Sequence, residues 1–220
     1  MPIDVFRDRR HAGQVLAPSL GGYARRPDVL VLALPRGGVP VAFEVAQALF
    51  APLDVFIVRK LGAPGHEEYA IGAVASGGVR VLNPNVINML GIDETAVEAV
   101  TAAEQAELTR CETLYRENLP PPTIKGQSVI LVDDGLATGA TMLAAIKALK
   151  AQQPARIVVA VPTAAPDVCE QLRHEADEVV CATTPEPFRA VGRWYEDFAQ
   201  TSDEEVRELL AVARRNAPKD

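Results

Sequence analysis

The sequence predicts an α/β fold with a mostly parallel sheet that helices cover on both faces. Continuous apolar runs of strand length alternate with helical patterns, which is typical of parallel strands joined by crossover helices. With 220 residues, 48% of them apolar, the chain is long enough to bury a sizeable core. We therefore treat residues 1–220 as a single domain.

The strands and helices of this sheet follow from periodicity along the chain. Val129 to Val132 is the clearest buried strand, because four apolar residues follow one another. A helix between two such strands implies a parallel pair with a right-handed crossover. We expect strands at residues 28–34, 53–58, 129–132, 155–162 and 178–181, and helices at 39–50, 142–149 and 167–175.

Two segments near the N-terminal half interrupt this alternation. Residues 8–24 carry an irregular helical pattern, which Pro18 should end or kink. Residues 61–69 are rich in Gly and Pro and lack periodicity, so we expect a mobile loop there.

The middle of the chain predicts a hairpin and then a helical insertion. Residues 70–82 form two short apolar runs around Ser76-Gly77-Gly78, which indicates the hairpin. Asp93 is a good N-cap for a long amphipathic helix that should end at about Asn118. We interpret residues 84–125 as a helical insertion packed on the core.

Composition and charge narrow the class of protein. The net charge is −7, which argues against nucleic acid as a general partner. We expect neither a signal peptide nor a membrane span, because residues 1–13 lack an apolar core and no run approaches ~20 apolar residues. Cys111, Cys169 and Cys181 are scattered, which predicts no zinc site and a reduced, cytoplasmic setting. The sequence leaves open whether the protein forms a homodimer.

The stretch from Val129 to Thr141 reads VILVDDGLATGAT and combines a strand, two aspartates and a loop of small and hydroxyl residues. The loop leads into a helix, whose first N–H groups lack internal partners and whose dipole is positive at that end. That end therefore favours a phosphate. Asp133 and Asp134 would repel a phosphate, so we expect them to serve hydroxyls or a metal. A ribose with a 5′-phosphate meets both demands.

This stretch resembles the phosphoribosyl-diphosphate-binding motif of type I phosphoribosyltransferases, with two acidic residues followed at the right spacing by Thr-Gly-x-Thr. The resemblance covers roughly residues 28–182 and is strongest to uncharacterised bacterial members with a similar loop. It implies that Asp133 and Asp134 face the ribose 2′- and 3′-hydroxyls, whereas the loop wraps the 5′-phosphate. The motif departs at Gly135, where the family usually has an aliphatic residue.

A second candidate site follows the strand at 28–34. The turn Pro35-Arg36-Gly37-Gly38 offers an anion free backbone N–H groups and a fixed cation. The resemblance makes this turn the diphosphate loop, with a non-proline cis peptide bond that would fall at Pro35–Arg36. Arg59 and Lys60 end the next strand and would close on a second face of the diphosphate. The resemblance also implies that residues 61–69 form a lid over the substrates.

The C-terminal part is expected to hold the acceptor. Residues 183–220 should form a hood and a terminal helix, and Ser202 with Glu205 forms a capping box for that helix. The resemblance implies that the acceptor base lies under the hood, where Trp194 or Tyr195 would stack against it. Packing of the terminal helix would explain the same aromatic residues.

Ala137 narrows the range of acceptor bases. Members of the family that act on hypoxanthine, guanine or xanthine usually have aspartate at this position, whereas alanine resembles the adenine, orotate and uracil enzymes. A general base would then come from the lid or the hood, with Glu67 or Glu68 the first to test. The resemblance implies Mg²⁺ as cofactor, but no metal ligand is directly assignable from the sequence.

We therefore expect a phosphoribosyltransferase that moves ribose 5-phosphate from phosphoribosyl diphosphate to a nitrogenous acceptor, such as a nucleobase, with release of diphosphate. Two alternatives stay open: a regulator that binds phosphoribosyl diphosphate or nucleotides without turnover, and an enzyme that uses another phosphosugar. The residues expected to act in catalysis are Asp133, Asp134, Arg36, Lys60 and Glu67. Those expected to bind phosphoribosyl diphosphate are Arg36, Gly37, Gly38, Arg59, Lys60, Asp133, Asp134, Ala137, Thr138, Gly139, Ala140 and Thr141.

Overall fold

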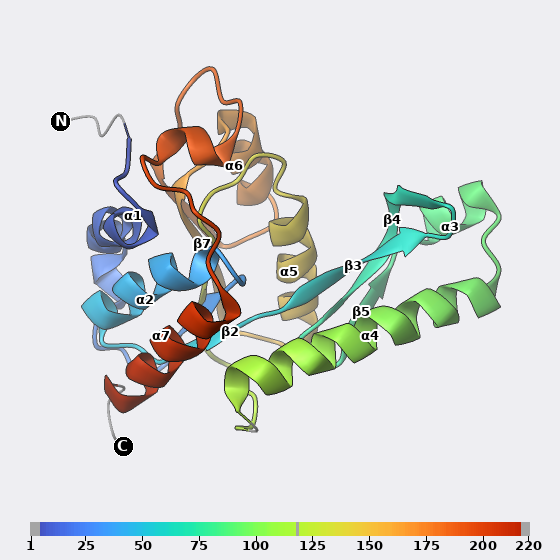
Figure 1. Cartoon of the computed structure of the whole chain (residues 1–220), viewed down its shortest axis with the longest axis horizontal. Helices are drawn as coiled ribbons and strands as arrows, with labels where there is room; N and C mark the ends of the chain where they lie inside the picture. Colours follow the sequence, from blue (N-terminus) through green and yellow to red (C-terminus); the bar gives the residue numbers. More distant parts are fainter. Residues whose placement is uncertain (1–4, 118, 217–220) are drawn as a thin grey trace.

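A five-stranded parallel sheet forms the centre of the protein (Figure 1). The computed structural model describes residues 5–117 and 119–216. Its strands lie in the order β2-β1-β6-β7-β8, and every neighbouring pair is parallel, so the predicted α/β fold is confirmed. The strands are β1 (Val29–Ala33), β2 (Leu53–Val55), β6 (Ser128–Val132), β7 (Arg156–Thr163) and β8 (Glu178–Thr183).

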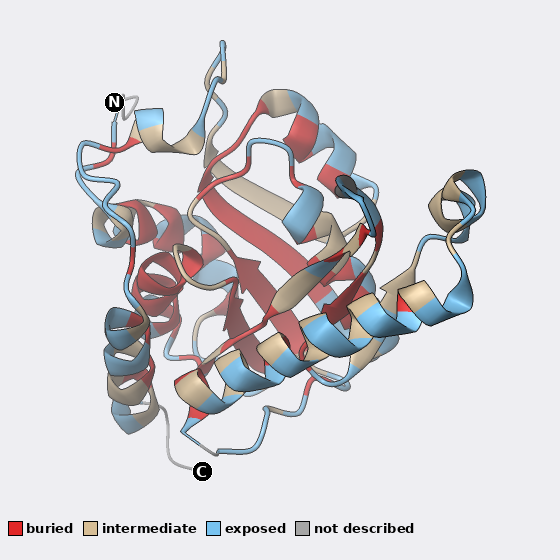
Figure 2. Ribbon diagram, turned by 45° about the vertical axis from the view of Figure 1, so that its right-hand side comes forward, coloured by how far each residue is buried: buried red, intermediate tan, exposed pale blue. Residues whose placement is uncertain are grey.

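Helices cover both faces of this sheet, because alternate strand residues point into two separate cores. Val31 belongs to one core and Leu32 to the other, and both are fully buried. Figure 2 shows the central strands as the most continuously buried part of the chain. The first core is closed by α1 (Arg9–Leu16), the 3₁₀-helix η1 (Ala17–Tyr23), α2 (Gly38–Leu49) and α7 (Asp203–Asn216), and the second by α5 (Ala140–Ala151) and α6 (Pro166–Arg173).

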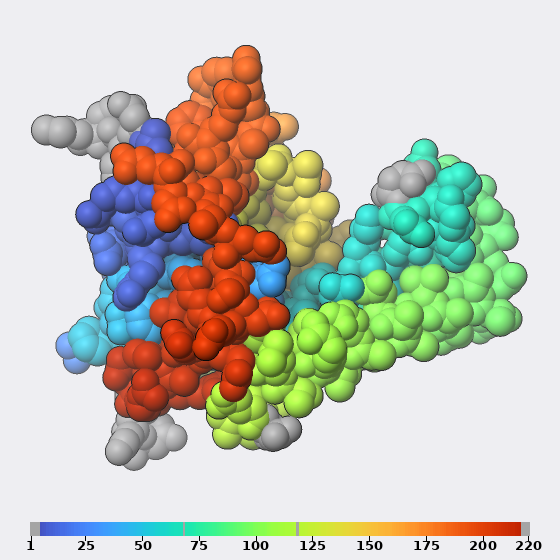
Figure 3. All heavy atoms as spheres, viewed as in Figure 1, coloured from blue at the N-terminus to red at the C-terminus, as the bar shows by residue number. Residues whose placement is uncertain are grey.

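Residues 58–116, here called the arm, project from the body of the protein (Figures 1 and 3). Three antiparallel strands, ordered β3-β4-β5, pack against the long helix α4. The predicted N-cap is confirmed, because the Asp93 carboxylate accepts a hydrogen bond of 2.8 Å from the Ala96 N–H. The elements of the arm are β3 (Val58–Ala63), β4 (His66–Ala75), β5 (Val79–Leu82), α3 (Pro84–Leu90) and α4 (Glu94–Arg116).

Two predictions for the start of the arm are wrong. The strand expected at 53–58 is divided, since β2 pairs with β1 only over Leu53–Val55 and β3 begins in another sheet at Val58. The mobile loop expected at 61–69 is instead the end of β3, a turn and the start of β4. Glycine misled the prediction: at Gly62 a Cβ atom would lie 3.1 Å from the Glu67 carbonyl oxygen, so close strand approach requires glycine there.

The C-terminal end of α4 is fixed to the edge strand β2. Arg116 is buried, and its Nε atom lies 3.0 Å from Asp54 while its Nη2 atom donates to the Val55 carbonyl at 2.9 Å. Because breaking a buried ion pair leaves an uncompensated charge, this contact holds the base of the arm firmly. The helix predicted to end at about Asn118 ends at Arg116, and Asn118 itself lies outside the described residues.

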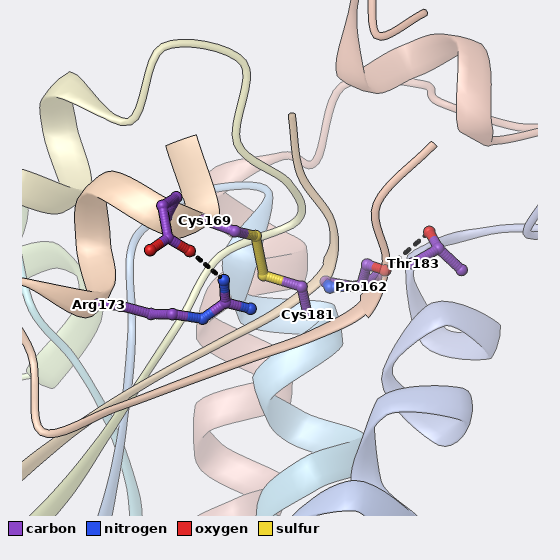
Figure 4. Close-up of a disulfide and its surroundings, with 6 residues drawn as sticks. Pro162, Cys169, Arg173, Cys181 and Thr183 are labelled. Carbon is purple, nitrogen blue, oxygen red and sulfur yellow. Dashed lines mark hydrogen bonds and ion pairs between the residues drawn. A yellow bond between two sulfur atoms is a disulfide. The ribbon is translucent and has the colours of Figure 1, made fainter. Parts of the chain in front are cut away.

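The cysteines depart from the prediction of three separate, reduced thiols. Cys169 of α6 and Cys181 of β8 form a disulfide (Figure 4), and Cys111 on α4 is free. The pairing could not be predicted from sequence spacing, because it depends on how α6 packs beside β8. Within residues 5–117 and 119–216, every helix is too short or too polar to cross a membrane.

Candidate functional site

The acidic pair and the glycine turn meet at the carboxyl edge of the sheet. Asp133 and Asp134 follow β6, and residues 35–38 follow β1, the strand beside it. A Cβ atom on Gly37 would overlap the Asp134 carboxylate, and one on Gly38 would lie 3.0 Å from the Asp133 Cα atom. The two loops are therefore in direct contact. The Pro35–Arg36 peptide bond is cis, as the resemblance implied.

Arg9 holds the Asp134 carboxylate in place. Its Nε atom donates to Asp134 Oδ2 at 2.8 Å, and its Nη1 atom donates to the Ala199 carbonyl at 2.6 Å. The guanidinium also lies over the Phe198 ring, 4.0 Å from its centroid. Sequence reasoning missed this residue, and no local pattern marks it, because 125 positions separate Arg9 from Asp134.

Both carboxyls of the acidic pair have raised pKa values. Burial raises the pKa of Asp133 well above its usual value, and the charge of Asp134 raises it further. Burial also raises the pKa of Asp134, although the hydrogen bond from Arg9 acts in the opposite direction. Such shifts are common where carboxylates gather at a functional site.

The loop after the acidic pair ends at the N-terminus of α5. The first backbone bond of α5 runs from the Leu143 N–H to the Gly139 carbonyl at 2.8 Å, so the N–H groups of residues 140–142 face out of the helix end. Ala137 and Thr138 are exposed before it, and Thr141 is exposed on its first turn. Gly139 has a φ of +67°, which favours glycine. The segment thus ends in an open helix N-terminus.

Gly135 replaces the usual aliphatic residue because two other elements occupy that space. A Cβ atom there would lie 2.5 Å from Val191 Cγ1, in the 3₁₀-helix η2 (Val191–Trp194), and 3.1 Å from the Thr163 carbonyl oxygen at the end of β7. The hood therefore contacts the loop directly at its first residue.

A cavity of about 470 Å³, here called the rim cavity, opens beside the glycine turn. The turn contributes Arg36, β3 contributes Arg59, and α5 contributes Thr141. Its far wall comes from α4, and Asp203 closes it from the start of α7. The structure thus brings three of the predicted site segments together around one hollow.

Lys60 and Glu67 lie apart from this cavity. The Lys60 Nζ atom is exposed and donates to the Glu67 carbonyl oxygen at 2.8 Å across the β3–β4 hairpin. Glu67 lies beside Gly62, and four residues of extended strand place Gly62 about 13 Å along β3 from Val58. The hairpin therefore carries both residues along the arm, away from the edge of the sheet. The side chain of Glu68 lies outside the described residues.

The two aromatic residues of the hood lie in different surroundings. Tyr195 is buried, its ring contacts Phe6 and Phe198, and its hydroxyl donates to the Asp134 carbonyl at 2.5 Å. The structure does not leave this ring open for stacking on a base. Trp194 is half-buried, and Phe188 stacks against it with the ring centroids 6.2 Å apart.

The chain is similar over nearly its whole length to proteins of one family. Residues 11–196 match the family model described as the phosphoribosyl transferase domain. A Mycobacterium tuberculosis protein, from strain H37Rv and named provisionally as a phosphoribosyl transferase, is 45% identical over 212 residues, which make up 96% of this chain and 48% of that protein. The chain thus spans about half the length of this curated relative.

A solved structure has the same fold. The crystal structure of TT1426 from Thermus thermophilus is 46% identical and superposes with a TM-score of 0.83, covering 94% of this chain and 97% of that one. The family match over most of the chain and the acidic pair at the edge of the sheet agree. The chain belongs to the phosphoribosyl transferase domain family.

Proposed function

We propose that this chain binds phosphoribosyl diphosphate and transfers its ribose 5-phosphate group to a nitrogenous acceptor. One observation supports this above all: Asp133 and Asp134 lie in contact with the glycine turn and precede the open N-terminus of α5 on one sheet edge. Ligands of parallel sheets bind beyond this edge. Carboxylates flanked by two anion-binding turns suit a sugar that carries a phosphate group at each end.

Each part of the edge would take one part of the substrate. The ribose 2′- and 3′-hydroxyls would donate to the acidic pair, and the 5′-phosphate would accept bonds from residues 137–141. The diphosphate would lie on the turn at Gly37 and Gly38. Arg9, through its bond to Asp134, would keep one carboxylate aimed at the ribose.

The reaction would exchange one bond at the C1 atom of ribose. The bond from C1 to the diphosphate oxygen breaks and its electron pair leaves with the diphosphate, while the lone pair of the acceptor nitrogen forms the new bond. Negative charge grows on the departing diphosphate, and Arg36 together with the backbone N–H group of Gly37 would stabilise it, whereas the Gly38 N–H group already donates to the Leu34 carbonyl at 3.1 Å. A proton on the acceptor nitrogen passes to a base.

Mg²⁺ fits this site as a companion of the substrate. Within the described parts of the chain, no three His, Cys, Asp or Glu side chains gather as a metal site. Mg²⁺ at phosphate sites usually needs only one or two protein carboxylates beside the substrate phosphates and water. The acidic pair meets that smaller requirement. When bound, Mg²⁺ supplies charge neutralisation for the diphosphate.

The acceptor would lie between the hood and the acidic pair. Trp194 is the hood aromatic residue that Tyr195 leaves for this role, and its buried Nε1 atom has no hydrogen-bond partner among the described residues. Tyr195 would instead hold the hood on the Asp134 carbonyl. Because residue 137 is alanine, the proposed acceptors are those that need no carboxylate at this position.

The experiment is calorimetry with phosphoribosyl diphosphate and Mg²⁺, followed by diphosphate release across a panel of nucleobases. The double variant Asp133→Asn, Asp134→Asn should lose detectable binding of the sugar phosphate while keeping a native circular dichroism spectrum. The exposed Asp167→Asn, on α6, serves as the matched control and should bind like the wild type. Unchanged affinity in the double variant would contradict the proposal.

Turnover decides between the enzyme and the regulator. Release of diphosphate with any base supports the transferase. Tight binding without release across the panel would favour a protein that senses phosphoribosyl diphosphate. A cytoplasmic location and a homodimer remain predictions.

A further inference from the structure

The wall of the rim cavity that faces the glycine turn comes from α4. Glu107, Cys111 and Tyr115 lie along one stripe of this helix, at the spacing that brings residues onto the same face. Arg110 lies beside them and lines the same cavity. The arm therefore reaches the candidate site with a helix, although the lid was expected to do so with a loop.

Three arginines from three elements line this cavity. They are Arg36 on the glycine turn, Arg59 on β3 and Arg110 on α4. Each side chain is partly exposed, with 37%, 38% and 59% of its surface accessible, respectively. A cavity with three accessible guanidinium groups is suited to an anion of more than one charge, because each group presents paired N–H donors to phosphate oxygens.

Each arginine is paired with one carboxylate. Arg59 Nε lies 2.7 Å from Glu104, and Arg36 Nη1 lies 3.5 Å from Asp203. Arg110 binds Glu107 through two bonds of 2.8 Å each.

Neighbouring charges couple these pairs. The pKa of Glu107 is lowered to about 2, chiefly by the hydrogen bond from Arg110, and the charge of Arg59 contributes to this lowering. Glu107 raises the pKa of Arg110, and Asp203 adds to this shift. The three arginines also line one cavity, where a single anion would contact them.

We propose that α4 completes the diphosphate end of the site, with Arg110 as a third binding residue beside Arg36 of the glycine turn and Arg59 of β3. The carboxylates balance these arginines while the cavity holds no anion, and diphosphate oxygens replace them on binding. This inference rests on the proposed function, because it assigns the anion in the cavity to the leaving group of phosphoribosyl diphosphate.

Lys60 does not take this role in the observed arrangement. This basic residue of the hairpin, beside Arg59, is bound to the Glu67 carbonyl oxygen and does not line the cavity. Arg110 lines the cavity from α4, a different element from the glycine turn that carries Arg36 and from β3 that carries Arg59. Two walls that each supply a guanidinium would grip both ends of a diphosphate.

The test compares Arg110→Gln with Arg173→Gln. Arg173 is a matched control, because it also forms an exposed i,i+3 pair with a glutamate, Glu170 (Figure 4), but lies on α6 and does not line the cavity. Calorimetry measures inorganic diphosphate and ribose 5-phosphate separately. We expect Arg110→Gln to weaken diphosphate about tenfold, the loss of one charge-assisted contact, and ribose 5-phosphate less than twofold.

Glu107→Gln distinguishes ligand binding from a structural role. Both Glu107→Gln and Arg110→Gln break the helix ion pair, but only the second removes a cation from the cavity. We expect Glu107→Gln to bind diphosphate at least as tightly as the wild type, because a competing carboxylate is gone. Equal losses in both variants, or no loss in Arg110→Gln, would overturn the inference. A wild-type protein that binds neither ligand would instead overturn the proposed function.

Discussion

Gly37→Ala tests whether the acidic pair must keep its position for sugar-phosphate binding. Gly37 has φ −59° and ψ −32°, which alanine adopts without strain, so any effect comes from space alone. The added Cβ atom would overlap the Asp134 carboxylate and would lie 3.1 Å from the Arg9 Nε atom. The carboxylate therefore has to swing away from Arg9.

The magnitude follows from the contact that is lost. Displacing Asp134 removes one charge-assisted hydrogen bond of 2.8 Å, worth about 1.5–3 kcal/mol. If the ligand must restore the original position, its affinity falls by about 10- to 150-fold. The same free energy lowers the melting temperature by at most about 10 °C in a protein of this size. The variant should thus stay folded while losing most of its affinity.

Gly38→Ala and Gly21→Ala make the comparison quantitative. At Gly38 the new Cβ atom would lie 2.8 Å from the Val132 carbonyl oxygen, which is backbone and cannot rotate away. We therefore expect Gly38→Ala to lower the stability of the protein more than its affinity. At Gly21 nothing lies within 4 Å, so both stability and affinity should match the wild type. Thermal melting and calorimetry with phosphoribosyl diphosphate measure the two quantities.

One result would refute this reasoning. If Gly37→Ala binds phosphoribosyl diphosphate as tightly as Gly21→Ala does, the position of the Asp134 carboxylate does not matter to the ligand. The edge of the sheet would then lose its assignment as the ribose site, whatever happens to stability in Gly38→Ala.

Three further predictions concern charge. Arg36→Ala should weaken diphosphate about tenfold and ribose 5-phosphate much less, and equal losses in calorimetry would argue against its role. Affinity for the sugar phosphate should fall on acidification well above pH 3.8, because the pKa of Asp133 is raised. Asp134→Asn removes the negative charge that helps to raise the pKa of Asp133, so in this variant the loss of affinity on acidification should occur at lower pH. A raised pKa also means that the charged form of Asp133 destabilises the folded state, because the folded protein holds the proton of this carboxyl more tightly than the unfolded chain does. The free energy of unfolding should therefore rise as pH drops through the folded-state pKa of Asp133. Melting curves against pH, compared with Asp133→Asn, test this sign.

Local patterns predicted most of the secondary structure. The apolar run before Asp133 gave a central strand, and the Asp93 cap marked the start of α4, because strand and helix periods are properties of neighbouring residues. The acidic pair and the glycine turn could be placed on one edge for a similar reason. Parallel strands all end on the same side, so residues that follow two adjacent strands must meet.

Glycine was the least reliable guide. Residues 61–69 resembled a loop, yet Gly62 permits close pairing of two strands and Gly65, with φ +75°, forms their turn. The sequence does not distinguish a glycine that loosens a chain from one that lets two backbones approach. The pairing partner decides between them, and that partner is known only once β4 has folded back on β3.

By itself, the sequence determined the parallel sheet, its edge and the acids that line it. Only the tertiary structure decided which distant side chains serve that edge. Arg9 reaches Asp134 from the N-terminal helix, Tyr195 is buried under the hood, and Arg110 faces the turn from the arm. Periodicity along the chain reports how each segment is buried, whereas contacts between segments depend on how the finished elements pack, and no short pattern records that packing.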